Sequence, residues 1–267
     1  MIANILSIAG SDPSGGAGIQ ADIKAISANG AYAMTALTAL TAQNTQGVSA
    51  VSLVEPEMVA RQISAVRDDI RVDAVKIGML GSAAIIRAVA EALDGCDAPI
   101  VLDTVMVAKS GDRLLEEEAV QALRDHLLPR VTVITPNLPE AADLLGEEEV
   151  ADEEGMARQA DRLRAMGAQA VLLKGGHLRG DLSRDLLLSG AAEIWLDGNR
   201  IPTKNTHGTG CSLSSALAAN LGRKMQMPQA AKRAKAYVAG AIRAAGQLSV
   251  GSGEGHGPIH HLHDTWS

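Results

Sequence analysis

Short apolar runs alternate along this chain with stretches of helical periodicity, and this alternation limits the fold more than any other feature of the sequence. Five runs are typical of buried strands, at residues 3–9, 74–77, 100–102, 131–134 and 170–173. Helical patterns follow them, at residues 57–66, 83–93, 116–127, 140–145 and 152–166. Strands joined through helices form a parallel sheet that is covered by helices on both faces. The sequence therefore predicts an α/β protein with three layers, α/β/α, around a central, mostly parallel sheet.

An edge hairpin and a single domain complete this expectation. Two further apolar runs, at residues 185–188 and 193–196, are separated by Ser-Gly-Ala-Ala and predict an antiparallel hairpin near one edge of the sheet. The chain has 267 residues, of which 46% are hydrophobic, so it can bury one large core. Its most polar stretch, residues 146–155, is too short for a linker and leads into a helical pattern. We expect one domain spanning residues 1–267.

Charge and cysteine content exclude several classes of function. The net charge is -7 and no run rich in lysine or arginine offsets it, which argues against a nucleic-acid partner. No apolar run approaches the roughly 20 residues that a membrane-spanning helix needs. Cys96 and Cys211 lie far apart in a chain that begins without a signal peptide, which is typical of a reducing environment. We expect a cytoplasmic protein that does not bind membranes.

A turn of small residues, 205–211, leads directly into a helix-forming stretch. The backbone N–H groups of Gly208, Thr209 and Gly210 can approach a ligand closely, and the start of the helix adds its positive dipole end. Together they predict an anion hole. Cys211 would lie on the first turn, where the same field should lower the pKa of its thiol from about 8.5. The alternative is that the turn only begins a helix and that Cys211 is a small buried residue.

A second glycine-rich segment, residues 8–19, follows the first predicted strand and precedes a helical stretch. Loops at the carboxyl ends of parallel strands are where open α/β sheets bind ligands. The glycine spacing is not that of a dinucleotide-binding loop, and no Walker sequence occurs in the chain. The segment predicts a ligand-binding loop of another kind, in which residues 11–18 could act as a lid. A flexible connection is the alternative.

Polar residues follow three of the predicted strands. Asp103 follows residues 100–102, Lys174 follows residues 170–173, and both Asn137 and Glu140 come shortly after residue 134. The carboxyl ends of parallel strands meet at one edge of a sheet, so these side chains should gather on the same rim as the anion hole. The sequence therefore predicts one metal and phosphate site.

These segments together resemble the hydroxymethylpyrimidine/phosphomethylpyrimidine kinases of thiamine synthesis, members of the ribokinase-like superfamily. The resemblance covers nearly the whole chain, in ordered motifs at residues 9–22, 41–45, 76–80, 103–111, 135–141, 174–177 and 205–211. It implies a ribokinase-like fold, ATP with Mg²⁺ as phosphoryl donor, a homodimer, and two successive phosphorylations of 4-amino-5-hydroxymethyl-2-methylpyrimidine to its diphosphate. Two alternatives stay open, a kinase for pyridoxal or a related vitamin B6 alcohol and a non-catalytic binding protein on the same fold.

The resemblance also implies which residues bind the substrate, namely Gly10, Asp22, Gln43, Met79 and Val105. The amide of Gln43 can pair with the exocyclic amine and a ring nitrogen, and Asp22 can accept from the amine or the hydroxyl. Met79 and Val105 would supply apolar faces to the ring. Without the resemblance, Asp22 and Gln43 would be ordinary surface or capping residues and Met79 a core residue.

The phosphate side is implied in the same way. Asn137 and Glu140 resemble the Asn-x-x-Glu element with which the superfamily holds Mg²⁺, often through water. Asp103 is a further candidate near the metal and the phosphates, and Lys174 would neutralise the charge on the transferred group. Glu140 could instead be an early-helix carboxylate that the helix dipole stabilises. Lys109 could face the same rim, without an assigned role.

The resemblance implies that Cys211 takes the proton of the hydroxymethyl group while the amides of residues 208–211 hold the transferred charge. If so, Cys211→Ala should lower kcat by ~10²-fold or more. Many sugar kinases of the superfamily carry aspartate at this place. His207, next to the turn, is expected to be structural or phosphate-adjacent. A tail of four histidines at residues 255–263 lacks partners with zinc-site spacing, so zinc is not expected.

Overall fold

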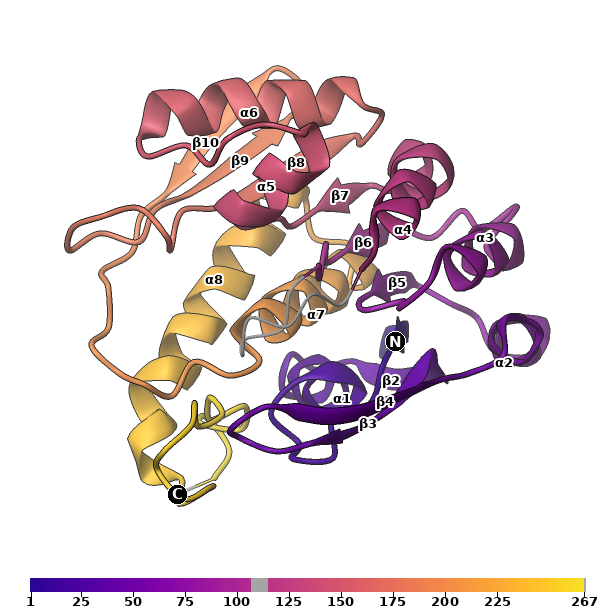
Figure 1. The fold of residues 1–267 in the computed structure, drawn as a ribbon, viewed down its shortest axis with the longest axis horizontal. Coiled ribbons are helices and arrows are strands. Elements are labelled where there is room, and N and C mark those ends of the chain that lie inside the picture. Colours follow the sequence, from indigo (N-terminus) through magenta and orange to yellow (C-terminus); the bar gives the residue numbers. More distant parts are fainter. Residues whose placement is uncertain (107–114, 267) are drawn as a thin grey trace.

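The computed structural model describes residues 1–106 and 115–266, which contain one eight-stranded sheet and a separate two-stranded hairpin (Figure 1). The order of the large sheet is β10-β9-β8-β7-β6-β5-β1-β2. Its strands are β1 (Asn4–Ala9), β2 (Tyr32–Leu37), β5 (Ala74–Ile77), β6 (Ile100–Leu102), β7 (Val133–Ile134), β8 (Ala170–Lys174), β9 (Asp185–Ser189) and β10 (Ala192–Leu196). The hairpin pairs β3 (Ala39–Gln43) with β4 (Val48–Leu53).

Neighbouring strands from β8 to β2 are parallel, and β9 and β10 are antiparallel additions at one edge. Ile8 illustrates the register, since it stands opposite Ala36 of β2 and Ile77 of β5. The predicted mostly parallel sheet and its edge hairpin are therefore confirmed.

Helices cover both faces of the sheet and make the outer layers (Figure 1). One face carries α1 (Gly18–Ala28), α7 (Thr209–Gly222) and α8 (Met227–Arg243). The other carries α2 (Pro56–Asp69), α3 (Ala83–Ala92), α4 (Glu117–Ala122), α5 (Leu138–Leu145) and α6 (Glu153–Ala165). In β6, Leu102 packs into the core on the α2–α6 side and Val101 into the core on the α7 side. This alternation is the two-residue period of a strand buried on both faces.

Two predicted elements differ in detail. The helix predicted over residues 116–127 is α4 followed by a π-helical turn, η1 (Leu123–Leu127), and a 3₁₀ turn, η2 (Leu128–Arg130). Pro129 lies in the first turn of η2, where its missing N–H cannot continue the helical hydrogen bonds. The strand predicted from residue 131 is shorter than expected and begins at Val133. A last 3₁₀ turn, η3 (Ala244–Gln247), follows α8.

The sheet has a topological switch point beside β1. The chain leaves β1 toward β2 on one side, whereas the strands from β5 to β8 continue the sheet on the other side. Open α/β sheets bind ligands outside the carboxyl ends of the strands at such a point. Among the described residues, no helix is both long enough and apolar enough to cross a membrane.

Candidate active site

The predicted substrate residues Gly10 and Met79 meet at this switch point. Gly10 follows β1 and Met79 follows β5, and a Cβ added to Gly10 would lie 2.9 Å from the Met79 Cε atom. Thr38 Oγ1 donates to the Met79 carbonyl at 2.7 Å, which fixes the segment after β5. The structure therefore places two of the expected substrate contacts side by side.

The β3–β4 hairpin brings Gln43 to the same place. Thr41 Oγ1 donates to the carbonyl of Ser11 at 2.8 Å, so this face of β3 is turned toward the glycine-rich loop. Because side chains alternate along a strand, Gln43 lies on the same face as Thr41, and its Oε1 is 3.3 Å from Thr41 Oγ1. Gln43 is only half-buried, which leaves its amide accessible to a ligand.

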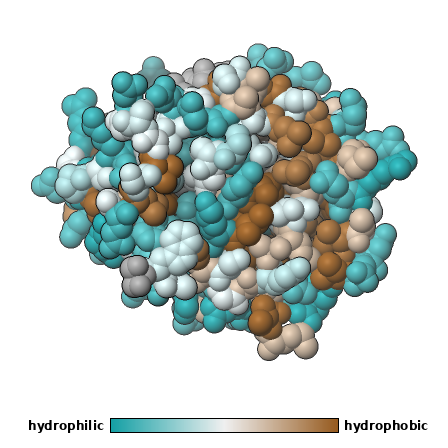
Figure 2. All heavy atoms as spheres, turned by 90° about the horizontal axis from the view of Figure 1, so that it is seen from below, coloured by the Kyte–Doolittle hydropathy of each residue, from teal (hydrophilic) through white to brown (hydrophobic). Residues whose placement is uncertain are grey.

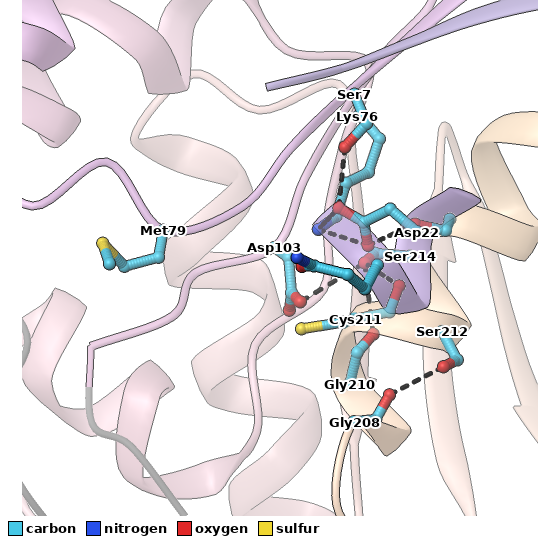
Figure 3. A network of polar contacts seen from close by, with 12 residues as sticks. Ser7, Asp22, Lys76, Met79, Asp103, Gly208, Gly210, Cys211, Ser212 and Ser214 are labelled. Atoms are coloured by element: carbon cyan, nitrogen blue, oxygen red, sulfur yellow. Dashed lines mark hydrogen bonds and ion pairs between the residues drawn. The ribbon is translucent and has the colours of Figure 1, made fainter. Parts of the chain in front are cut away.

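Asp22 is placed differently from the expectation. Its side chain is 0% exposed, and Lys76 Nζ of β5, also 0% exposed, lies 2.9 Å from each carboxylate oxygen. Ser7 Oγ donates to the same carboxylate at 2.7 Å (Figure 3). Ser215 Oγ also donates to it, at 2.7 Å. Asp22 has no exposed surface for a substrate in this structure, so it supports the site from beneath. Its position one turn into α1 turns it toward the sheet rather than toward the rim.

The helix that follows the glycine turn is fixed by two adjacent serines. Ser215 donates to Asp22, and Ser214 Oγ lies 3.3 Å from Asp103 Oδ2 (Figure 3). Both serines are fully buried. Because these contacts come from two residues of one helical turn, they fix both the rotation and the axial position of α7. Cys211, one turn earlier, is thereby held in place.

The turn before α7 has the features of an anion site. Gly208 is the N-cap with φ of 80°, a left-handed conformation that favours glycine. Among the described residues, the N–H groups of Gly210 and Cys211 have no hydrogen-bond acceptor. A Cβ on Gly210 would lie 3.4 Å from Lys174 Nζ, so the ammonium lies beside the helix start that carries the free amides. Thr209 instead closes the turn, because its Oγ1 donates to the Thr206 carbonyl at 2.8 Å.

The pKa of the Cys211 thiol is raised, whereas the sequence-based expectation was a lowered pKa. Burial raises its pKa to about 12, and the carboxylates of Asp103 and Asp22 add to the rise. The nearby Lys76 ammonium and a hydrogen bond from the Gly18 amide favour the thiolate without offsetting burial. The expectation of a lowered pKa is therefore wrong, because desolvation outweighs the helix dipole. In Figure 3 the thiol extends from α7 toward Asp103.

Asp103, Glu140 and Lys174 form one charge cluster at the carboxyl ends of the parallel strands, as the sequence predicted. Lys174 Nζ lies 3.5 Å from Asp103 Oδ1 and 3.6 Å from Glu140 Oε2. Burial raises the pKa of Glu140, and the charge of Asp103 raises it further despite the attraction of Lys174. Burial alone would lower the pKa of Lys174, but Glu140 and Asp103 more than offset it, and the pKa is raised. The lysine therefore stays protonated between two carboxylates.

Asn137 and Glu140 form a capping box at the start of α5. Asn137 Oδ1 accepts from the Glu140 N–H at 2.8 Å, and Glu140 Oε2 accepts from the Asn137 N–H at 2.8 Å. Glu140 Oε2 also accepts from Thr104 Oγ1 at 3.2 Å. The alternative reading of Glu140 as a helix-start carboxylate thus describes its hydrogen bonds, while its position beside Lys174 also places it in the charge cluster.

The donor set fits a magnesium ion that is shared with phosphates. Asp103 and Glu140 offer two hard carboxylates beside the one ammonium of Lys174, and a divalent cation would balance the second carboxylate. Mg²⁺ is commonly bound by one or two carboxylates together with substrate phosphates and water. The described residues contain no group of three or more His, Cys, Asp or Glu side chains that could hold a metal alone.

Other residues of the site were missed or lie at its border. Lys76 belongs to the motif at residues 76–80, and no role is predicted for it from the sequence, although a lysine within the apolar run Ala-Val-Lys-Ile is itself a sign of a buried charge. Ser214, Ser215 and Thr104 gave no such signal. Val105 is half-buried, and its N–H donates to the Asp103 carbonyl at 2.8 Å. Lys109 lies outside the described residues.

Comparison with known proteins agrees with this geometry. The model of the family described as phosphomethylpyrimidine kinase matches residues 12–260. The hydroxymethylpyrimidine/phosphomethylpyrimidine kinase of Salmonella typhimurium is 51% identical over 264 residues, which cover 98% of each chain. A phosphomethylpyrimidine kinase structure from Clostridium difficile has a TM-score of 0.80 at 40% identity, covering 90% of this chain and 99% of the other. The pyridoxal kinase of Staphylococcus aureus in complex with ADP has a TM-score of 0.90 at 34% identity, covering 99% and 95%.

Proposed function

The chain belongs to the phosphomethylpyrimidine kinase family, and we propose that it phosphorylates 4-amino-5-hydroxymethyl-2-methylpyrimidine and then the resulting monophosphate, with ATP as donor, in thiamine biosynthesis. One observation carries this proposal. The free amides at the start of α7 and the Lys174 ammonium lie close to Cys211, whose thiol extends toward Asp103 (Figure 3). The site thus joins an anion hole to a place for an acceptor alcohol.

The residues that we propose to bind the substrate suit a small amino-substituted ring. Gly10 lets the ring approach the backbone, Met79 offers an apolar face, and Gln43 presents an amide that can pair with an amine and a ring nitrogen. Val105 is proposed to complete the apolar side of the substrate site. Asp22 contributes by holding α1, β5 and α7 together through Lys76 and Ser215.

Phosphoryl transfer requires mainly positioning and neutralisation of charge. The amides of Gly210 and Cys211 and the ammonium of Lys174 are fixed donors for the oxygens of the transferred group. Asp103 and Glu140 would hold Mg²⁺, which supplies further neutralisation of the phosphates when bound. Asn137 would support the metal by orienting Glu140 through the capping box.

Cys211 is proposed to contact the acceptor hydroxyl as a neutral thiol. Burial and the neighbouring carboxylates raise its pKa to about 12, so the thiolate is a minor form at neutral pH. A neutral thiol can hold the hydroxyl in line with the phosphate through a hydrogen bond, and the hydroxyl proton then leaves on an oxygen of the transferred phosphoryl group. Positioning would then contribute more than base strength.

A kinase assay with separate acceptors tests the proposal. The purified protein receives ATP and Mg²⁺ with the hydroxymethylpyrimidine, its monophosphate or pyridoxal, and the products are identified by mass. Lys174→Met serves as the inactive control. We expect turnover of both pyrimidines by the wild type. Turnover of pyridoxal alone would refute the proposal and establish vitamin B6 kinase activity, the second candidate, which the high structural similarity to a pyridoxal kinase favours.

A homodimer is part of the proposal. The β3–β4 hairpin leaves Leu40, Val51 and Leu53 between 44% and 54% exposed, on the lower side of Figure 1. Figure 2 views that side and shows apolar residues gathered across it. An exposed apolar patch of this kind often marks a protein interface. Light scattering should give twice the chain mass of 27.6 kDa, and a monomer mass would refute this part.

A further inference from the structure

Two segments that lie far apart in the sequence meet at the site through Asp12 and His207. Asp12 belongs to the glycine-rich loop at residues 10–18, and His207 belongs to the turn at residues 206–211. His207 Nε2 lies 2.8 Å from Asp12 Oδ2. The His207 side chain is 10% exposed and the Asp12 side chain is 2% exposed, so water competes little for this contact. The phosphoryl transfer described above assigns neither residue a role.

Asp12 also organises the loop around the contact. Its Oδ1 accepts from the Ser14 N–H at 2.9 Å and its Oδ2 from the Ala17 N–H at 2.7 Å. The Asp12 N–H in turn donates to Gln20 Oε1 at 2.8 Å. These bonds hold the loop in a closed turn, so they favour a fixed wall over the lid that its composition suggested.

The two segments also touch through their backbones. A Cβ added to Gly208 would overlap the carbonyl oxygen of Gly16, and a Cβ added to Gly16 would overlap the His207 ring. No side chain separates the loop from the turn at these points, so a shift of one segment is felt directly by the other.

The C-terminal tail supports His207 from the opposite side. The His207 N–H donates to the Gly257 carbonyl at 3.0 Å, and His207 forms a parallel bridge with Pro258. Ile259 next to it is fully buried. The His256 N–H donates to the Thr45 carbonyl at 2.9 Å, which ties the tail to the β3–β4 hairpin. The histidine-rich tail therefore acts here as a brace behind the turn.

We propose that Asp12 and His207 are positioning residues, a loop–turn clamp that sets the distance between the acceptor alcohol and the transferred phosphate. The inference rests on the function proposed above, because that function places the acceptor against the loop and the phosphate against the turn. A misplacement of about 1 Å between reacting groups costs on the order of 10²-fold in rate. Loss of the clamp therefore lowers kcat far more than it weakens the binding of either substrate.

Three histidine variants test the clamp. His207→Leu removes the contact with Asp12, whereas His207→Gln keeps a donor near the position of Nε2. His256→Leu is the matched control, because His256 belongs to the same tail and is exposed. Steady-state kinetics use the acceptor that the wild type phosphorylates. We expect His207→Leu to lower kcat by ~10- to 100-fold with both KM values within about threefold, and the other two variants to stay within about threefold of wild-type kcat.

Hydrogen–deuterium exchange of the peptide over residues 11–18 measures how firmly the clamp holds the loop, and it does not depend on catalysis. We expect faster exchange in His207→Leu and wild-type exchange in His207→Gln and His256→Leu. Unchanged exchange in His207→Leu, or faster exchange with unchanged kcat, would overturn the inference. If His207→Leu does not fold, Gly16→Ala, whose Cβ drives the ring from its place, takes its position in both assays. A wild type that phosphorylates no pyrimidine refutes the proposed function alone, since the exchange result does not depend on the acceptor.

Discussion

Removal of the Lys76 ammonium should cost more stability than any other single change beneath the site. Lys76→Met leaves the Asp22 carboxylate buried with only Ser7 and Ser215 as hydrogen-bond donors. Breaking a fully buried ion pair from one side costs about 3–5 kcal/mol, because the remaining charge stays desolvated and unpaired. At about 2–4 °C per kcal/mol for a chain near this size, the melting temperature should fall by about 6–20 °C.

The double variant Asp22→Asn/Lys76→Met separates the charge effect from lost packing. The amide of asparagine is neutral and can still accept from a serine hydroxyl, so the double variant should recover at least about half of the lost free energy of unfolding. Urea denaturation and thermal melting measure both variants. A loss below about 1 kcal/mol for Lys76→Met, or a double variant no more stable than the single one, would refute the reasoning.

The pH dependence of this contribution has a definite sign. The attraction of Asp22 outweighs burial and raises the pKa of Lys76 above its ordinary value. A group whose pKa is raised in the folded state contributes stability that is complete below its unfolded pKa and is lost only as the pH rises through the folded value. The difference between wild type and Lys76→Met should therefore stay constant as the pH rises from 6 to 9.

Four further predictions concern the rim and the loop. If Cys211 acts as a neutral thiol, kcat should change by less than about threefold as the pH rises from 7 to 9, whereas a thiolate base of pKa about 12 requires a rise of roughly 100-fold. Lys174→Met should lower kcat by ~10²–10³-fold in the coupled kinase assay, because it removes a fixed donor between two carboxylates, and a loss under about tenfold would contradict the role. Asn137→Ala should cost about 1 kcal/mol in urea denaturation through the lost cap, and an unchanged Mg²⁺ requirement would contradict the proposal that it supports the metal through Glu140. Burial raises the pKa of Asp12, but His207 and the loop amides lower it to about 2. The ionised Asp12 therefore stabilises the fold above pH ~4, and this stabilisation is lost as the pH falls toward 2. Asp12→Asn should flatten that part of an acid-unfolding curve.

Much of the fold could be predicted from the sequence because parallel strands are buried on both faces. Runs such as Ala-Val-Lys-Ile and Ile-Val-Leu have no polar alternation, and they stand out between amphipathic helices. The β3–β4 hairpin was not predicted, because β4 is mostly exposed and carries no buried face to reveal it. The helix α8 was missed as well, although Pro228 stands at its start as an N-terminal signal.

The site was predictable in position and less so in detail. The gathering of Asp103, Glu140 and Lys174 could be predicted, because residues that follow parallel strands lie at the same edge of the sheet. Strand direction says nothing about depth, which decides the surroundings of Asp22 and the pKa of Cys211. Asp22 turned out to be buried beneath the rim, and Cys211 turned out to be desolvated enough for its pKa to rise. Spacing along the chain gives the neighbours of a residue, but burial depends on segments that are distant in sequence.

The charges beneath and on the rim explain why depth matters for phosphoryl transfer. Asp22 and Lys76 neutralise each other below the site, so they hold α7 without adding to its field. On the rim, the two carboxylates of Asp103 and Glu140 face the single ammonium of Lys174, which leaves an excess of negative charge where phosphates must bind. The free amides of α7 offset only part of that charge, because a helix end carries about half a positive charge. Asp103 and Glu140 would hold a divalent cation bound together with the nucleotide, and its charge would balance the remainder.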